Sequence, residues 1–465
     1  MRLKKFLYNK LFYIKNIIFI SIIFLYITNL LSFFIKRRKL NENYHSIQSD
    51  LNLDFNKSIN KEIRIAIYTH SLSNGGLQRI TSILLSYLEK VKIFKVYLFN
   101  QKEKEKDEYK IPNNLKKAHI KDSNNVINLI KQLKAKKIDI LLYQFPRWEE
   151  IKILNNLKKT KIIFYIHSSI CYWIYSSLLH VLRIYNEYKN SKYIISLIPV
   201  ESNYLFKKWG IESVLFENFM TYDYNSSIVS NLSSKKILLI GRANSKLKRF
   251  EIGIQAMEYI KIELPEIILN IISKIEGSEE LISHIHNLNL ENNIKFVNFS
   301  TDPSINFKDA SLNIITSISE CFPLVLSETK IYGIPNILLG LDYVLLSKNG
   351  TEIIYDDLPE TLAKVSKKIL FNKIYKKDLS KKARKSMKIF NNNEIFRKWK
   401  ILLLSIYNEL NIYKLFSDSS NDNEKQLYEL LKSQVLLLNR RMKIYENLTI
   451  EYIENLPLNN FSLNF

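Results

Sequence analysis

The stretch SECFPLVLSETKIYGIP, residues 319–335, is the most informative part of the sequence because it contains residues that favour both the start and the end of one helix. Pro323 suits the first turn of a helix, and Gly333, followed two residues later by a second proline, suits its end. Short apolar runs flank this segment at Leu312–Thr316 and Asn336–Leu339. A helix between two such runs is typical of parallel α/β structure.

The same alternation of short apolar runs and amphipathic segments predicts two parallel sheets, with a ligand cleft between them. The expected strands of the first sheet are Ile63–Tyr68, Lys95–Phe99, Ile138–Tyr143, Lys161–Ile166 and Tyr193–Ile198. Those of the second are Ile237–Ile240, Ile267–Ile272, Ile294–Val297, Leu312–Thr316 and Asn336–Leu339.

A polar stretch without periodicity, Thr221–Ser234, follows Glu217-Asn218-Phe219 and is the natural hinge between the two halves. The expected organisation is a membrane anchor with basic flanks (1–40), a linker (41–61), a first nucleotide-fold domain (62–218), a second (219–390), a closing helix (391–410) and a linker with an amphipathic helical tail (411–465). The tail predicts a helix because Leu427, Leu431, Val435, Leu438, Met442 and Tyr445 share one face.

The segment Ile17–Ile35 carries no charge and as a helix would span roughly 29 Å, close to the hydrocarbon thickness of a bilayer. It is longer than the apolar region of a signal peptide and lacks a small-residue cleavage site, so it predicts an uncleaved anchor. Basic residues precede and follow it, and the positive-inside rule therefore gives no orientation.

Composition alone excludes few classes of protein. With 69 basic against 45 acidic residues the formal charge is +24, which favours anionic partners, but the lysines are scattered through nearly every segment. The 46% of hydrophobic residues is enough for two cored domains, so disorder is not expected. Cys171 and Cys321 match no metal-ligand or redox spacing, which indicates a reducing compartment or no redox role.

Glu320 and Glu328 are the strongest candidate site residues. Glu320 precedes the punctuated helix, and Glu328 lies inside it about one and a half turns past Pro323. The free amides near Phe322, Pro323 and Leu324 would face the same cleft as both carboxylates, and such a pair can grip sugar and ribose hydroxyls. The alternative is that both glutamates are simply exposed to solvent, but this would not explain the proline and glycine at the two ends of the helix.

Two loops after predicted strands add to this site. Gly75 and Gly76 follow the first strand and would let a ligand approach the backbone at a helix amino terminus, or simply make a tight turn. Arg242 and Lys248 follow the first strand of the second half, and a cationic loop there suits a departing diphosphate. A solvated basic loop is the alternative. No Asp-x-Asp motif is present to hold a metal for the same work.

Between Ile63 and Tyr407 the chain resembles the retaining glycosyltransferases of the GT-B fold, family 4. Glu320 and Glu328 match the family's paired glutamates, which implies contacts to the donor sugar and to the ribose. The resemblance further implies that Arg242 and Lys248 hold the donor diphosphate, and that His167 contacts the donor sugar or its phosphate. Gly75 with Gly76 match the family's glycine loop, and Asn218 matches the residue ending the first domain. The chain departs from the pattern at Cys321 and Arg249, where glycine is common.

These matches predict a glycosyltransferase that moves a sugar from a nucleotide-diphosphate sugar to a glycan or lipid-linked acceptor, with retention and without an obligatory metal or other cofactor. The apolar segment predicts membrane association with the catalytic domains on the cytoplasmic face, where nucleotide sugars are made. The tail helix is a candidate for self-association. Two other classes remain open: a GT-B phosphorylase or sugar-nucleotide epimerase, and a membrane-tethered polyanion-binding protein. No aromatic-rich basic motif points to nucleic acid.

Overall fold

The computed structural model describes residues 61–416, except for 74, 102–107, 121–124, 145–146, 170–177, 226, 244, 299, 301, 303 and 342–343. The expected membrane anchor, most of the linker after it and the amphipathic tail helix lie outside these residues. Of the helices that the structure describes, none combines the length and apolar character needed to cross a bilayer.

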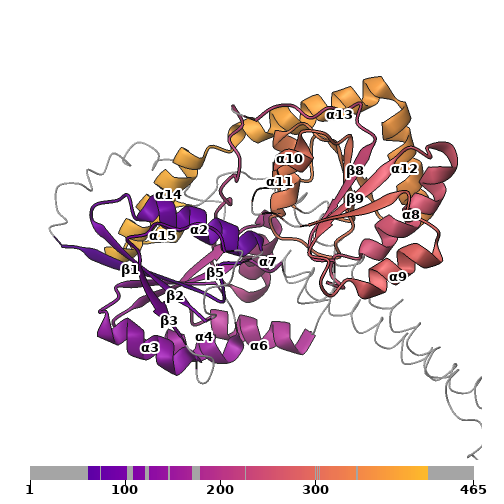
Figure 1. Cartoon of the computed structure of the whole chain (residues 1–465). Coiled ribbons are helices and arrows are strands. Elements are labelled where there is room, and N and C mark those ends of the chain that lie inside the picture. The colour runs from indigo at the N-terminus through magenta and orange to yellow at the C-terminus, as the bar shows by residue number, and fades with distance from the viewer. Residues whose placement is uncertain are drawn as a thin grey trace, which may run out of the picture.

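The first domain is a seven-stranded parallel sheet in the order β3-β2-β1-β4-β5-β6-β7. The central strands are nearly continuous apolar runs because helices cover both faces (Figure 1). Its strands are β1 (Ile63–Thr69), β2 (Phe94–Asn100), β3 (Lys116–His119), β4 (Ile140–Tyr143), β5 (Lys161–Ile166), β6 (Tyr193–Ser196) and β7 (Val214–Leu215). Its helices are α2 (Gly76–Leu88), α3 (Asn125–Ala135), α4 (Trp148–Asn155), α6 (Leu178–Tyr188) and α7 (Pro199–Trp209).

The second domain is a six-stranded parallel sheet in the order β10-β9-β8-β11-β12-β13. Its strands are β8 (Lys236–Ile240), β9 (Ile268–Ser273), β10 (Ile294–Asn298), β11 (Leu312–Ile315), β12 (Asn336–Leu339) and β13 (Thr351–Ile354). Its helices are α8 (Phe250–Glu263), α9 (Glu279–Asn287), α10 (Ser304–Phe307), α11 (Leu324–Ile331), α12 (Pro359–Phe371), α13 (Lys373–Ser386) and the 3₁₀ turn η2 (Met387–Ile389).

All ten predicted strands are confirmed to within a few residues, and the prediction of only five strands per sheet is wrong. The three missed strands are β3, β7 and β13, and each lies at the edge of a sheet. β3 reads Lys-Lys-Ala-His and β7 has only two residues, so neither carries the apolar run that marks a buried strand. Edge strands are covered less than central ones and need less apolar sequence.

The closing helix is α14 (Asn392–Tyr407), followed by α15 (Ile412–Leu415), and both return to the first domain, as Figure 1 shows for the chain's last described segment. Trp399 of α14 is almost fully buried, with its ring 5.4 Å from that of Tyr165 and 5.1 Å from that of Phe216. The chain therefore crosses between the domains twice.

The two crossings are bound to each other. The Asn392 side chain accepts a hydrogen bond from the amide of Met220 at 2.7 Å and donates one to its carbonyl at 2.8 Å. Beyond this point the polar stretch expected to be the hinge is tied to the second domain, for example by Arg384, which donates to the carbonyls of Tyr224 and Ser227. The flexible part of the connection is therefore shorter than the sequence predicts.

Candidate functional site

The site begins where β8 and β11 end, because the carboxyl ends of neighbouring parallel strands meet at one edge of a sheet. The loops that follow them are joined by a hydrogen bond from the Ile318 amide to the Leu247 carbonyl at 2.8 Å and by one from Thr316 Oγ1 to the Lys248 carbonyl at 2.5 Å. This fixed pair of loops brings Lys248 Nζ to within 2.5 Å of Glu320 Oε1. The structure thus brings two of the predicted site residues together.

Two backbone positions shape the cationic loop. Gly241 has φ 155°, a backbone conformation that residues with a side chain rarely adopt. Arg249 adopts a left-handed conformation with φ 47°. That conformation favours glycine, the residue that is common at this position in the family that the sequence resembles. Arg249 is held there by its bonds to the Thr316 carbonyl at 2.9 Å and to Asp357 at 2.7 Å.

Helix α11 presents the second carboxylate and is bounded nearly as the sequence predicts. Pro323 is the residue just before the helix rather than part of its first turn, and its carbonyl accepts from the Leu326 amide at 3.1 Å. At the other end Gly333 has φ 68°, and the amides of Gly333 and Ile334 bond back to the carbonyls of Lys330 and Thr329. Glu328 therefore lies on a helix stopped at both ends.

Glu328 is buried and is held from the other side of the cleft. Its Oε1 accepts from Arg79 Nη1 of helix α2 at 2.7 Å and from Thr221 Oγ1 at 2.7 Å. Arg79 also lies over the ring of Tyr222, at 5.1 Å from its centroid, and the Tyr222 hydroxyl donates to Asp302 at 2.9 Å. Burial, followed by the nearby Glu328 charge, raises the pKa of Tyr222 well above its ordinary value.

The first domain approaches the same edge at two other points. A Cβ on Gly76 would lie 3.3 Å from Leu324 Cδ1, so the glycine lets helix α2 come close to the start of α11. Ser169, in the loop after β5, hydrogen-bonds Ser319 in the loop before α11. Gly75 is the residue before α2, where a Cβ would meet only the mobile amide of Gln78. Of the two glycines, Gly76 is the one that the domain contact requires.

His167 and Asn218 come from the first domain. The His167 ring lies 4.0 Å from that of Tyr165, and its Nε2 is buried without a hydrogen-bond partner among the described residues. Burial lowers the pKa of His167 to about 3, so the imidazole is neutral at physiological pH. Asn218 is buried and accepts from the Tyr165 hydroxyl at 2.9 Å. Tyr165 thus supports both residues.

The remaining predicted residues divide by exposure. Arg242 is exposed in the loop after β8, where the described residues offer it no ion pair, so its guanidinium is open to an anionic ligand. Phe322, Pro323 and Leu324 are buried, and the Phe322 ring packs 6.2 Å from that of Phe390. Their side chains therefore support the loop, and any ligand contact falls to the backbone. Cys321 is a buried free thiol, and Cys171 lies outside the described residues.

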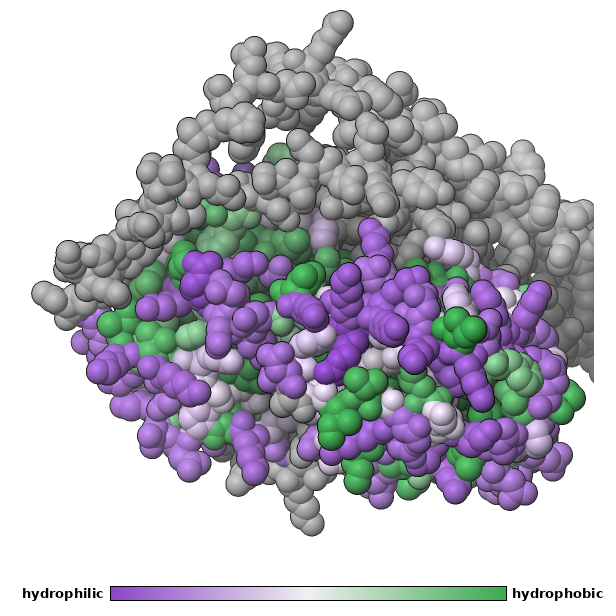
Figure 2. All heavy atoms as spheres, turned by 90° about the horizontal axis from the view of Figure 1, so that it is seen from above, coloured by the Kyte–Doolittle hydropathy of each residue, from purple (hydrophilic) through white to green (hydrophobic). Residues whose placement is uncertain are grey.

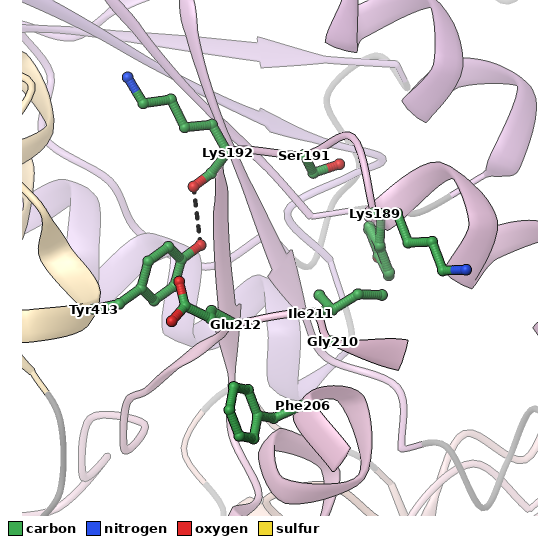
Figure 3. A pocket seen from close by; sticks show the side chains of 9 residues that line it. Lys189, Ser191, Lys192, Phe206, Gly210, Ile211, Glu212 and Tyr413 are labelled. Atoms are coloured by element: carbon green, nitrogen blue, oxygen red, sulfur yellow. Dashed lines mark hydrogen bonds between the residues drawn. The ribbon is translucent and has the colours of Figure 1, made fainter. Parts of the chain in front are cut away.

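Within the part of the chain that the structure describes, no group of three or more His, Cys, Asp and Glu side chains could hold a metal ion. A hollow of about 370 Å³ lies in the first domain beside the residues that precede β6 and β7, where Tyr413 of α15 donates to the Lys192 carbonyl at 2.9 Å (Figure 3). It lies at the amino edge of the sheet, opposite the cleft.

Sequence reasoning missed Arg79 and Thr221, the residues that bind Glu328. Arg79 lies three positions after Gly76 in α2 and so shares its face, which is the face that meets the other domain. That spacing was a usable signal. Thr221 follows the buried Met220 at the crossing, and nothing local distinguishes it from the polar residues after it.

Comparison with known proteins gives a family match for most of the second domain and a shared fold for much of the described chain. Residues 223–386 match the family model of Glycosyl transferases group 1. A protein of Haemophilus influenzae, described as an uncharacterized glycosyltransferase, is 21% identical over 299 residues, covering 63% of this chain and 83% of that protein.

Solved structures extend this likeness over three quarters of the chain. Sucrose-phosphate synthase from Thermosynechococcus elongatus superimposes with a TM-score of 0.63 at 15% identity, covering 75% of this chain and 100% of the other. HepE from Anabaena in complex with UDP-glucose gives a TM-score of 0.59 at 14% identity, with coverages of 74% and 100%. WaaG, a glycosyltransferase involved in lipopolysaccharide biosynthesis, gives 0.59 at 14%, with coverages of 74% and 99%. The predicted GT-B architecture of two parallel-sheet domains is confirmed.

Proposed function

We propose that this chain, which carries a group 1 glycosyl transferase domain, is a retaining glycosyltransferase of family 4 that moves a hexosyl group from a nucleotide-diphosphate sugar to an acceptor hydroxyl. The observation that carries this proposal is the convergence of Lys248, Glu320 and Glu328 at the carboxyl edge of the second sheet, facing the first domain. HepE, of the same fold, is seen with UDP-glucose.

The geometry suits departure of a diphosphate. Lys248 is only partly exposed, and the cationic loop adds the exposed Arg242, so negative charge developing on the leaving oxygen would meet two cations, of which Lys248 is partly withdrawn from water. Glu320 would lie beside the transferred sugar and accept its hydroxyls, while Glu328 would accept from the ribose. His167, being neutral, would offer the sugar or phosphate a hydrogen bond rather than a charge.

In the proposed reaction the bond between C1 and the diphosphate oxygen breaks, and the diphosphate leaves with the electron pair. The acceptor oxygen bonds to C1 from the same face, and its proton passes to the departing diphosphate. This route needs no side-chain nucleophile and no obligatory metal. Backbone amides at the start of α11 would add partial positive charge near the phosphates.

The acceptor we propose is a membrane-proximal glycan or lipid-linked sugar of a surface polysaccharide or lipopolysaccharide, with the catalytic domains associated with the membrane on its cytoplasmic face. The uncharged segment Ile17–Ile35 supports this, and WaaG offers a precedent for the fold in lipopolysaccharide biosynthesis. Protease treatment of intact cells checks the sidedness: the catalytic domains should be protected, and digestion from outside would contradict the proposal.

A donor-binding experiment tests the function. Thermal melting of the full chain is followed with UDP-sugars and GDP-sugars, and with CMP-sugars as a matched control that carries a single phosphate. We expect one nucleotide-diphosphate sugar to raise the melting temperature of the wild type and not that of Glu328→Gln, which keeps the side-chain shape without the charge. Transfer to phosphate, isomerisation of the donor, or salt-sensitive polyanion binding without donor binding would instead favour the other classes.

A further inference from the structure

The ion pair between Arg79 and Glu328 joins residues 249 positions apart, one in each domain. It is well shielded, since the Arg79 side chain is 14% exposed and that of Glu328 is 4% exposed. Burying two charges is costly, so such a pair persists only where geometry and further hydrogen bonds are favourable. A purely structural contact between two surfaces that separate would not need charges buried this deeply.

The surroundings of Arg79 fix its orientation. Its guanidinium lies over the Tyr222 ring, and Tyr222 is itself bound to Asp302 at 2.9 Å. Tyr109 lies on the same side, and burial raises its pKa to about 12, so its hydroxyl stays neutral beside the ion pair. Because a planar guanidinium stacks on an aromatic ring as an ammonium does not, the site is specific for arginine.

The two oxygens of Glu328 are used unequally. Oε1 accepts both from Arg79 Nη1 and from Thr221 Oγ1, each at 2.7 Å, whereas Oε2 has no hydrogen-bond partner among the residues that the structure describes. A carboxylate held through one oxygen has a fixed plane, and its second oxygen then points in a set direction. Glu328 is thus prepared for one ligand donor on Oε2.

We propose that Arg79 is a positioning residue for the donor: it holds Glu328 Oε1 so that Oε2 accepts a hydroxyl of the ribose in a nucleoside diphosphate. This inference rests on the proposed function, and it adds a contribution from the first domain to a site otherwise built by the second. Because Arg79 belongs to the first domain and Glu328 to the second, ribose recognition would depend on how the two domains meet.

The test compares a ribose donor with the matching 2′- or 3′-deoxyribose donor in full-chain wild type and in Arg79→Gln. A site built to bind a hydroxyl rejects the analogue that lacks it, because a buried polar group is left unpaired. We expect the wild type to prefer the ribose donor by roughly ten-fold or more in kcat/KM for at least one of the two analogues. In Arg79→Gln the preference should fall to within about three-fold, and donor KM should rise more than kcat falls.

Arg183→Gln is the matched control. Arg183 also lies in the first domain and also stacks on an aromatic ring, at 5.3 Å from that of Trp148, but it makes no contact with Glu328. It should leave both KM and the ribose preference unchanged. If Arg79→Gln does not melt cooperatively, Arg79→Lys is measured in its place, with an intermediate loss of preference expected.

The possible outcomes distinguish the role of Glu328 in the proposed function from the positioning role of Arg79. A wild type that accepts the ribose donor and both deoxyribose donors equally would overturn the role of Glu328 in the proposed function. A wild type that discriminates, with a variant that discriminates just as well, would overturn the positioning role of Arg79 and leave the function standing. A merely structural Arg79 would change stability without changing the preference between donors.

Discussion

The two carboxylates of the site are held in different ways. Glu320 is paired with Lys248 of its own domain, through two loops that are bonded to each other. Glu328 is paired with Arg79 of the opposite domain and with Thr221 at the crossing. The difference teaches that Glu320 is held within one domain, whereas the position of Glu328 depends on both domains.

The face of the molecule seen from above carries both polar and apolar side chains (Figure 2). Figure 2 views the molecule from above and shows hydrophilic side chains over much of the described face, with hydrophobic residues scattered among them. Scattered exposed apolar residues are normal on soluble domains and need no partner. The comparison between the two carboxylates is therefore where experiment is most informative.

The largest effect should come from the part of the site around Lys248 and Glu320. Replacing Lys248 by Ala removes the cation beside Glu320 and should lower kcat by roughly two orders of magnitude or more, since it would stabilise leaving-group charge. Donor KM should change much less. Steady-state kinetics checks this, with Lys246→Ala as the control, because Lys246 is exposed in the same loop. An unchanged kcat in Lys248→Ala would remove that role.

Changes in the part of the site around Glu328 should instead alter the donor KM. Thr221→Val keeps the shape of the side chain but removes one of the two donors to Glu328 Oε1, so donor KM should rise by roughly ten- to a hundred-fold, the worth of one hydrogen bond to a charged group. Thr361→Val is the matched control, because its hydroxyl bonds only Asp356 on the surface. A fall in kcat with KM unchanged would mean that both parts of the site act alike.

A smaller effect, on stability, concerns Arg249 in the loop that carries Lys248. Arg249 has a left-handed backbone conformation that costs a residue with a side chain about 1 kcal/mol more than glycine. Both Arg249→Gly and Arg249→Ala lose the bonds to Thr316 and Asp357, but only the alanine keeps the backbone cost. Denaturation midpoints should therefore fall in the order wild type, Gly, Ala. An alanine variant as stable as the glycine variant would show that the conformation carries no cost.

The same contrast explains what could be predicted from the sequence. Glu320, Lys248, Pro323 and Gly333 all belong to local stretches whose punctuation follows from backbone preferences, so the second domain's half of the site was predictable. The pair of Arg79 with Glu328 depends on how two separately folded domains meet: the spacing from Gly76 indicates the face on which Arg79 lies, but not its partner 249 residues away. The edge strands β3, β7 and β13 were not predicted for a related reason: they are less buried than central strands, so their sequences need no continuous apolar run.

A pH-dependent effect concerns His167, which the first domain contributes in neutral form. Burial lowers its pKa to about 3, against about 6.5 in an unfolded chain, so between these values the unfolded state binds a proton that the folded state does not. Stability should therefore fall as the pH drops through this window, and above about pH 6.5 the residue should have no such effect. His167→Gln cannot take up this proton, so the difference in melting temperature between wild type and variant should shift in favour of the variant as the pH falls from 7 to 4.5. A difference that stays constant would mean that His167 protonates equally in both states, and the imidazole would then be accessible to solvent and able to carry a charge at the sugar.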